Sequence, residues 1–193
     1  MKFKHPLMQN NITKNDFDVV IKFLKKQPIL TQNKRVEEFE RLWSKWLGVK
    51  YSVFVNSGSS ANFITLSALK EFTNKKEIIT PTLTWPSDIM AVLNNGFKPN
   101  FVDIDIETLS MNSNEIIKKI STKTAAVFIT HAQGFNGLTS KLLDELKKRK
   151  IILIEDVCES HGASYNNQKL GTFGLASNFS FYYAHHLSTI EGG

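Results

Sequence analysis

The sequence predicts an α/β fold in which a mostly parallel sheet carries helices on both faces. Short β-branched or aromatic runs alternate with amphipathic helical segments along most of the chain, a pattern typical of a doubly covered parallel sheet. The 193 residues include 41% hydrophobic and 22% charged side chains, the mix of an ordinary soluble domain with one packed core. Sheets of this kind bind ligands at the carboxyl ends of their strands, so functional residues are expected there.

Two amphipathic helices are predicted first, at Asp16–Lys26 and Lys34–Leu47. In the second, apolar residues from Val36 to Leu47 recur at helical spacing. The strands expected after them are 51–57, 77–80, 99–104, 125–131, 151–157 and 178–183. The helices expected between these strands are Ser60–Lys70, Ser87–Asn94, Asn114–Ser121 and Ser140–Lys148. No linker or internal repeat interrupts this order, which favours a single domain over residues 1–193.

Composition excludes several classes of function. Cys158 is the only cysteine, so these residues build neither a disulfide framework nor an iron–sulfur or thiolate-rich metal site. The net charge is +6, but the densest basic run, 147–150, falls at an expected helix end, where the helix dipole explains it; we expect no nucleic-acid partner. No apolar run reaches the roughly 18 residues of a membrane span, and the start of the chain lacks a signal-peptide pattern. We therefore expect a cytoplasmic protein without membrane attachment.

The chain stops at Glu191-Gly192-Gly193, a turn pattern directly after an expected strand. A domain rarely ends there, so we expect this sequence to be the N-terminal part of a longer protein.

Two strand ends in the first half of the chain have candidate binding residues. In NSGSSAN (56–62), Gly58 and Ser59 open a helix whose free N–H groups and hydroxyls suit a phosphate, although Ser59 or Ser60 equally suits a plain helix cap. In TPTLTWP, Trp85 lies just beyond the sheet edge, where an indole either covers a planar ring or packs in a core or interface.

A carboxylate follows the apolar strand in IILIEDVCESHG. Asp156 at a buried strand end requires a cationic or hydrogen-bonding partner, and a protonated pyridine nitrogen is a suitable one. The alternative is an Asp that caps the following turn. Glu159 and His161 lie shortly after it. Asp103, Asp105 and His131, at other strand ends, are interpreted as structural.

The final segment, NFSFYYAHHLSTIEGG, contains Ser180, His185 and Glu191 on a predicted strand and the turn that leaves it. The pair His185-His186 does not indicate a metal site, because adjacent side chains of an extended chain point to opposite faces and no further ligands follow at zinc-like spacing. No metal is expected.

Taken together, SGSSAN, TLTWP, EDVCESHGASYNNQKLGTFG and NFSFYYAHHLSTIEGG resemble the fold-type-I, vitamin-B6-dependent sugar aminotransferases of the DegT/DnrJ/StrS type, over nearly the whole chain. The resemblance implies that the chain is the cofactor-binding large domain, without the C-terminal small domain. It implies that Gly58, Ser59 and Ser180 bind the phosphate of pyridoxal or pyridoxamine 5'-phosphate. It also implies that Trp85 stacks on the ring and Asp156 pairs with its nitrogen. Glu159 stands where the family usually has Gln beside the ring hydroxyl.

His185 departs from the aminotransferase pattern, because those enzymes have at this position the lysine that bonds covalently to the cofactor. Imidazole has no primary amine, but its ordinary pKa of about 6.5 suits proton transfer. The segment HHLSTIEGG, with His185 in place of lysine, resembles the sugar 3-dehydratases of the family. This resemblance implies removal of the C3 hydroxyl from a nucleotide-linked 4-keto-6-deoxy sugar, with His185 as acid and base. It further implies glutamate as amino donor and a homodimer.

Two other interpretations stay open. In the first, the chain is a non-catalytic or regulatory relative that has lost its lysine. In the second, it is a ferredoxin-coupled 3-dehydratase whose iron–sulfur site lies beyond residue 193. Bound cofactor and turnover of a 4-keto sugar nucleotide separate the first from an enzyme.

Overall fold

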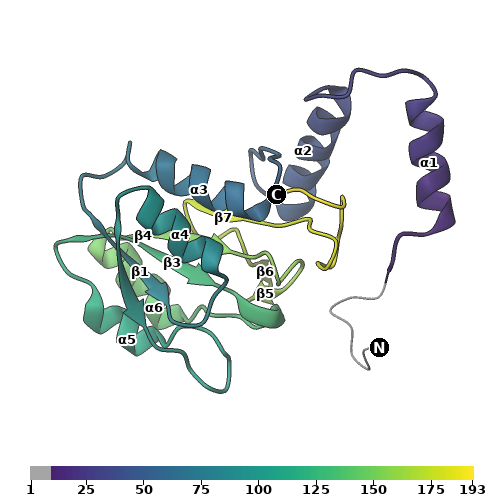
Figure 1. Ribbon diagram of the computed structural model, residues 1–193. Helices are drawn as coiled ribbons and strands as arrows, with labels where there is room; N and C mark the ends of the chain where they lie inside the picture. Colours follow the sequence, from purple (N-terminus) through teal and green to yellow (C-terminus); the bar gives the residue numbers. More distant parts are fainter. Residues whose placement is uncertain (1–9) are drawn as a thin grey trace, which may run out of the picture. The chain divides into compact units, whose positions relative to one another are not determined.

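The computed structural model describes residues 10–193 as two compact units, one ending at Phe54 and the other spanning Val55–Gly193 (Figure 1). The start of the chain, on which the expectation of no signal peptide depends, lies mostly outside the described residues. None of the helices in residues 10–193 has the length and apolarity needed to cross a bilayer.

The first unit contains helices α1 (Lys14–Leu24) and α2 (Lys34–Leu47). Helix α1 starts with a capping box between Thr13 and Asp16. Helix α2 begins after the cap Asn33 and ends at Gly48, whose φ of +89° is the left-handed conformation that terminates many helices. Both helices lie within about two residues of their predicted bounds.

The second unit contains a five-stranded sheet in the order β2-β1-β3-β4-β7, in which every pairing is parallel. Its strands are β1 (Glu77–Pro81), β2 (Lys98–Val102), β3 (Thr124–Thr130), β4 (Ile152–Asp156) and β7 (Ala176–Asn178). All seven residues of the central strand β3 are buried, as expected for a parallel strand covered on both faces. The predicted fold class is confirmed.

Helices cover both faces of this sheet. Helix α3 (Gly58–Leu69) packs against α4 (Pro86–Asn94), and α5 (Ser113–Lys119) packs against α6 (Ser140–Arg149) on the other face (Figure 1). The chain runs from β1 outward to β2 and then back across β1 to β3. The strand order therefore reverses between β1 and β3, which is where doubly wound sheets form a ligand crevice.

Two predicted strands are wrong. Residues 51–57 form no strand, because within residues 10–193 no strand lies beside their backbone. Phe54 N donates to the Glu40 carboxylate, and the backbone of Val55 bonds to Gly193. The strand expected at 178–183 is instead β7, which ends at Asn178. Beyond it the backbone of Phe181 bonds to Gly192 and Thr189, so the chain folds back on itself.

The chain also forms a hairpin that the sequence did not predict, from β5 (Ser164–Tyr165) and β6 (Gln168–Lys169). Its turn is Asn166-Asn167, with φ of +48° and +61°, a conformation that Asn tolerates better than most residues.

Candidate functional site

Polar side chains gather at the carboxyl ends of β1, β3 and β4, beside the point where the strand order reverses. Thr84 follows β1, Thr130 ends β3 and Asp156 ends β4. The hydroxyls of Thr84 and Thr130 lie 2.8 Å apart. The predicted strand-end location of Asp156 is therefore correct.

Asp156 is only 5% exposed, and both of its carboxylate oxygens accept hydrogen bonds. Oδ1 accepts from the backbone N–H of Cys158 at 2.9 Å, the turn-capping contact that was the structural alternative for this residue. Oδ2 accepts from Asn62 Nδ2 at 3.2 Å. The cap and a charge partner are compatible, since a carboxylate has about four acceptor positions and these bonds use two.

Asp88, which the sequence did not single out, is a fully buried carboxyl at this edge. It lies in the first turn of α4 with no exposed surface and accepts from Asn62 and Thr130 at 2.6 and 2.9 Å and from Thr84. Burial, followed by the negative charge of Asp156, raises the pKa of Asp88 well above its usual range. An acidic residue early in a helix is so common that no local signal distinguishes this one.

The start of α3 lies against Ser180. A Cβ placed on Gly58 would lie 2.7 Å from Ser180 Cβ and 3.2 Å from Cys158 Sγ, so only glycine fits this contact. Ser57, not Ser59 or Ser60, caps the helix by accepting from Ser60 N. The N–H groups of Gly58 and Ser59 bond to no acceptor within residues 10–193, as expected for the first turn of a helix.

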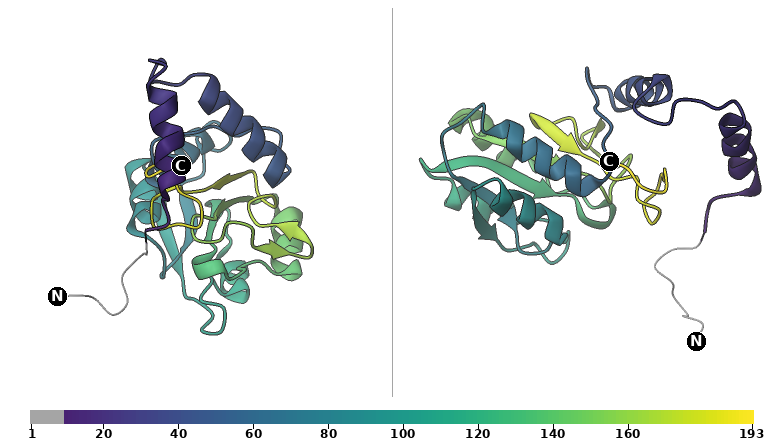
Figure 2. Two further views of the ribbon diagram at one scale, coloured as in Figure 1. Left: turned by 90° about the vertical axis from the view of Figure 1, so that its right-hand side faces the viewer. Right: turned by 45° about the horizontal axis from the view of Figure 1, so that its top comes forward.

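The C-terminal residue, Gly193, lies beside the same helix start (Figure 2). It exchanges two backbone hydrogen bonds with Val55, at 2.9 and 3.0 Å, and its Cα faces the backbone of Ser57 and Gly58. The segment from Ser180 to Gly193 is thus joined at both ends to the α3 start.

Trp85 is the residue that precedes α4, and 70% of its surface is exposed. The exposure excludes the core alternative within this chain and leaves the ring-covering and interface alternatives. Its neighbour Thr84 bonds to Asp88, which holds this loop at the same sheet edge as Asp156.

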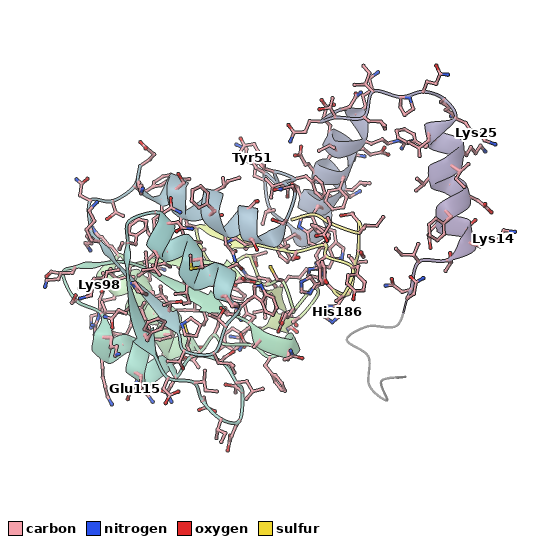
Figure 3. The ribbon with its side chains drawn as sticks, viewed as in Figure 1. Lys14, Lys25, Tyr51, Lys98, Glu115 and His186 are labelled. Carbon is pink, nitrogen blue, oxygen red and sulfur yellow. The ribbon has the colours of Figure 1, made fainter. Side chains whose placement is uncertain are left out.

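His185 is half-buried and lies close enough to Asp156 and Glu159 for their charges to act on it. Burial lowers the pKa of His185, the two carboxylates oppose that shift, and His186 adds to it. His186 is exposed on the C-terminal segment (Figure 3). His161 lies near both rings, with its centroid 6.2 Å from that of His185 and 5.7 Å from that of His186, and burial lowers its pKa to about 4.

Glu159 points toward the loop after β3. Its Oε2 accepts from Gln133 N at 3.0 Å and from Gln133 Nε2 at 3.3 Å. Gln133 has φ of +54°, an uncommon conformation that this pair of bonds helps to hold. Glu159 is therefore anchored to this loop, and its charge also acts on His185.

Glu155 and His131 are structural, as predicted for His131. Both have no exposed surface, and their side chains meet at 3.2 Å. His131 Nδ1 accepts from Gly137 N, so its Nε2 carries the hydrogen that faces Glu155. Three backbone N–H groups, those of Gly171, Phe173 and Gly174, also donate to Glu155, each at 2.8 Å.

The arrangement fits a phosphorylated pyridine ring. The Gly58 contact with Ser180 brings free N–H groups beside a serine hydroxyl, and the buried Asp156 carboxylate lies at the end of β4. His185 supplies an imidazole beside Asp156. In residues 10–193 no three His, Cys, Asp or Glu side chains group as metal ligands. The role of each residue stays a prediction.

Comparison with known proteins agrees with this geometry. A sequence profile of the DegT/DnrJ/EryC1/StrS aminotransferase family matches residues 10–193. GDP-4-keto-6-deoxy-D-mannose 3-dehydratase of Escherichia coli O55:H7 is 38% identical over 171 residues, which are 86% of this chain and 44% of that protein. GDP-perosamine synthase of Escherichia coli O157:H7 is 32% identical over 188 residues, 97% of this chain and 51% of that protein.

A solved structure of the E. coli 3-dehydratase with bound hydrated PLP superimposes with a TM-score of 0.91 at 33% identity. The superposition covers 98% of this chain and 50% of the chain in that structure. The chain therefore spans about half the length of the relatives it matches.

Proposed function

The chain belongs to the DegT/DnrJ/EryC1/StrS aminotransferase family, and on that premise we propose that the full-length protein is a sugar-nucleotide 3-dehydratase. It uses pyridoxamine 5'-phosphate to remove the C3 hydroxyl from a nucleotide-linked 4-keto-6-deoxy sugar. The observation that carries the proposal is His185, which lies beside Asp156 and Glu159 where the resemblance places the lysine of the aminotransferases. An imidazole cannot form the covalent bond of that lysine, which disfavours ordinary transamination.

The chain's own residues account for binding of the cofactor. The N–H groups of Gly58 and Ser59, with the Ser180 hydroxyl, hold its phosphate. Asp156 holds the protonated ring nitrogen, and the exposed indole of Trp85 covers the ring. When bound, the cofactor would supply a primary amine for the C4 ketone of the sugar and a pyridine ring that accepts electrons from the carbon bearing that amine.

His185 moves the proton. Because burial lowers its pKa, its imidazole is mostly neutral at pH 7 and could accept a proton from the cofactor carbon that bears the amine. The carboxylates of Asp156 and Glu159 stabilise the imidazolium that forms, since their charges favour the protonated ring. His185 can then return the proton to the departing C3 hydroxyl, which leaves as water.

Family resemblance supports the remaining parts of the proposal. Residues 1–193 form the cofactor-binding part of the large domain, glutamate restores the amine form of the cofactor, and two copies of the full-length protein make a homodimer. The curated relative in E. coli O55:H7 acts, by its name, on GDP-4-keto-6-deoxy-D-mannose, which makes a GDP-linked sugar the first substrate to test.

Product analysis tests the function. Full-length protein loaded with pyridoxamine 5'-phosphate and supplied with glutamate and GDP-4-keto-6-deoxy-D-mannose should give a sugar without oxygen at C3, observed by NMR of the released product. An amino group at C4 identifies an aminotransferase and contradicts the proposal. Bound cofactor without any turnover supports the non-catalytic alternative, and turnover only with a ferredoxin-type reductant supports the ferredoxin-coupled one.

A further inference from the structure

A second carboxyl group, that of Asp88, is connected to Asp156 through Asn62 and contacts side chains from three parts of the fold. Asp88 has no exposed surface. Its side chain contacts Asn62 on α3, Thr84 after β1 and Thr130 at the end of β3, and the Ser87 hydroxyl lies 3.5 Å from its Oδ1. These contacts fix both oxygens of Asp88: Oδ1 accepts from Asn62, and Oδ2 contacts the two threonine hydroxyls. The family resemblance assigns this residue no role.

Around Asp88 Oδ2 there is one hydrogen fewer than the number of hydrogen-bond contacts. Thr84 Oγ1, Thr130 Oγ1 and Asp88 Oδ2 are mutually within hydrogen-bond distance, so three contacts join three oxygens. The two threonines supply two hydroxyl hydrogens, and an ionised carboxylate supplies none. A proton on Asp88 would complete the third contact.

The contacts of Asn62 indicate the same shortage of hydrogen-bond donors. Its Nδ2 lies between the two carboxyl groups, 2.6 Å from Asp88 Oδ1 and 3.2 Å from Asp156 Oδ2. Its Oδ1 is buried with no hydrogen-bond partner in the described part of the chain, in a residue that is only 1% exposed. A buried polar atom without a partner is costly, and here it adjoins a cluster rich in acceptors and poor in donors.

Charge decides which carboxyl group keeps a proton. Two neighbouring buried carboxylates cannot both ionise cheaply. The Asp156 carboxylate accepts a backbone N–H from Cys158, and its negative charge, after burial, raises the pKa of Asp88. Cys158, the other titratable group near both, has its pKa raised by burial and by these carboxylates, so its thiol is neutral and adds no charge.

We propose that Asp88 is held as a neutral carboxylic acid and acts as a positioning residue for Asp156. One proton stays on Asp88, so the pair carries a single negative charge, located on Asp156. Asn62 joins the two groups and fixes the direction of the Asp156 carboxylate. The protonation state is inferred from these contacts, from burial and from the neighbouring charge, whereas its value in matching one protonated ring nitrogen rests on the proposed function.

Infrared spectroscopy of the full-length protein tests the proposal without cofactor or turnover. At pH 7 the wild-type protein should show the carbonyl stretch of a protonated carboxylic acid, shifted in heavy water. The band should be absent in Asp88→Asn and unchanged in the control Asp144→Asn, which alters an exposed aspartate on α6. In Asp156→Asn the band should disappear at a lower pH than in the wild type, because the repulsion that favours the protonated form is gone.

A wild-type spectrum without the band at pH 7, or a band that survives in Asp88→Asn, overturns the proposal. If Asp88→Asn does not fold, Thr130→Val provides the decision: loss of one hydroxyl at Oδ2 should shift the band frequency, and an unmoved band contradicts the assignment. Because none of these measurements involves the sugar, their failure is distinct from failure of the dehydratase function.

Discussion

Gly58 and Ser180 are far apart in the sequence, yet the Cα of the glycine faces the serine side chain so closely that a Cβ would lie 2.7 Å from Ser180 Cβ. The contact places the free N–H groups at the start of α3 beside a serine hydroxyl. This hydroxyl accepts from Tyr182 N at 3.3 Å, which leaves its own hydrogen available to a ligand. The phosphate site that we propose depends on this close approach.

Gly58→Ala is therefore expected to impair cofactor binding. The added methyl group must move α3 or the Ser180 segment, and overpacking of this kind costs about 1–3 kcal/mol of stability. In the full-length protein the dissociation constant of pyridoxamine 5'-phosphate, measured by titration well below the unfolding temperature, should rise at least about tenfold, equivalent to about 1.4 kcal/mol.

Ser67→Ala is the matched control, since it changes an exposed residue of the same helix and should alter stability by less than about 0.5 kcal/mol. Wild-type cofactor affinity in Gly58→Ala would argue against a phosphate at this helix start.

Glu155→Gln is expected to destabilise the second unit strongly. The Glu155 carboxylate accepts three backbone N–H groups and faces His131, and an amide must turn its NH2 group toward at least one of these donors. Removing one partner from a buried charged network costs about 3–5 kcal/mol. Denaturant unfolding of the variant, compared with the exposed control Glu107→Gln, measures the loss; equal midpoints would show that the network is not structural.

The parts of the fold that the sequence predicts best are those whose ends have local chemical signals. The bounds predicted for helix α2 from the spacing of its apolar residues match the observed ones, and the structure shows Asn33 capping its start and Gly48 ending it. Strand β4 likewise ends at the predicted carboxylate Asp156. The run at 51–57 has the residue types of a strand, but a strand also needs a neighbour, and pairing is a property of the whole fold.

The candidate site likewise contains one carboxyl group that the sequence predicts and one that it does not. Asp156 was predictable because it ends an apolar run, where a charge demands explanation. Asp88 was not, because its burial arises only when β1 and β3 become neighbours and bring Thr84 and Thr130 around it. From the sequence, Asp88 is indistinguishable from a solvated residue in the first turn of a helix.

The stability of Asp88→Asn relative to the wild type should depend on pH. The folded chain raises the pKa of Asp88, so the wild type gains full stability from its protonated form below pH about 3.9 and loses it as the pH rises toward the folded pKa. Asn does not ionise, so the variant should gain up to about 1.4 kcal/mol relative to the wild type for each unit between pH 5 and 7. Urea unfolding at several pH values measures this slope, and a difference independent of pH would exclude a raised pKa at Asp88.

His185→Lys should change how the cofactor is held. A lysine at this position offers a primary amine that bonds covalently to pyridoxal phosphate, visible as a yellow absorbance that persists through gel filtration and is lost on borohydride reduction. C3 deoxygenation should fall, because the amine competes with the sugar. The same substitution at the exposed neighbour, His186→Lys, should give no such absorbance; equal colour in both variants would mean that His185 does not occupy the lysine position.

His185→Asn distinguishes proton transfer from cofactor binding. Asparagine keeps approximate size and hydrogen bonding but has no titratable proton, so deoxygenation should slow by about 10²–10⁴-fold, the usual cost of losing a general acid–base group. Affinity for the sugar nucleotide and for pyridoxamine phosphate should change little, because neither depends on the imidazole in the proposed scheme. Rapid-mixing kinetics with preloaded full-length protein separate the two effects. His186→Asn should retain the wild-type rate, since that ring is exposed on the C-terminal segment. Wild-type deoxygenation in His185→Asn, or its loss in His186→Asn alone, would show that His185 is not the residue that carries the proton.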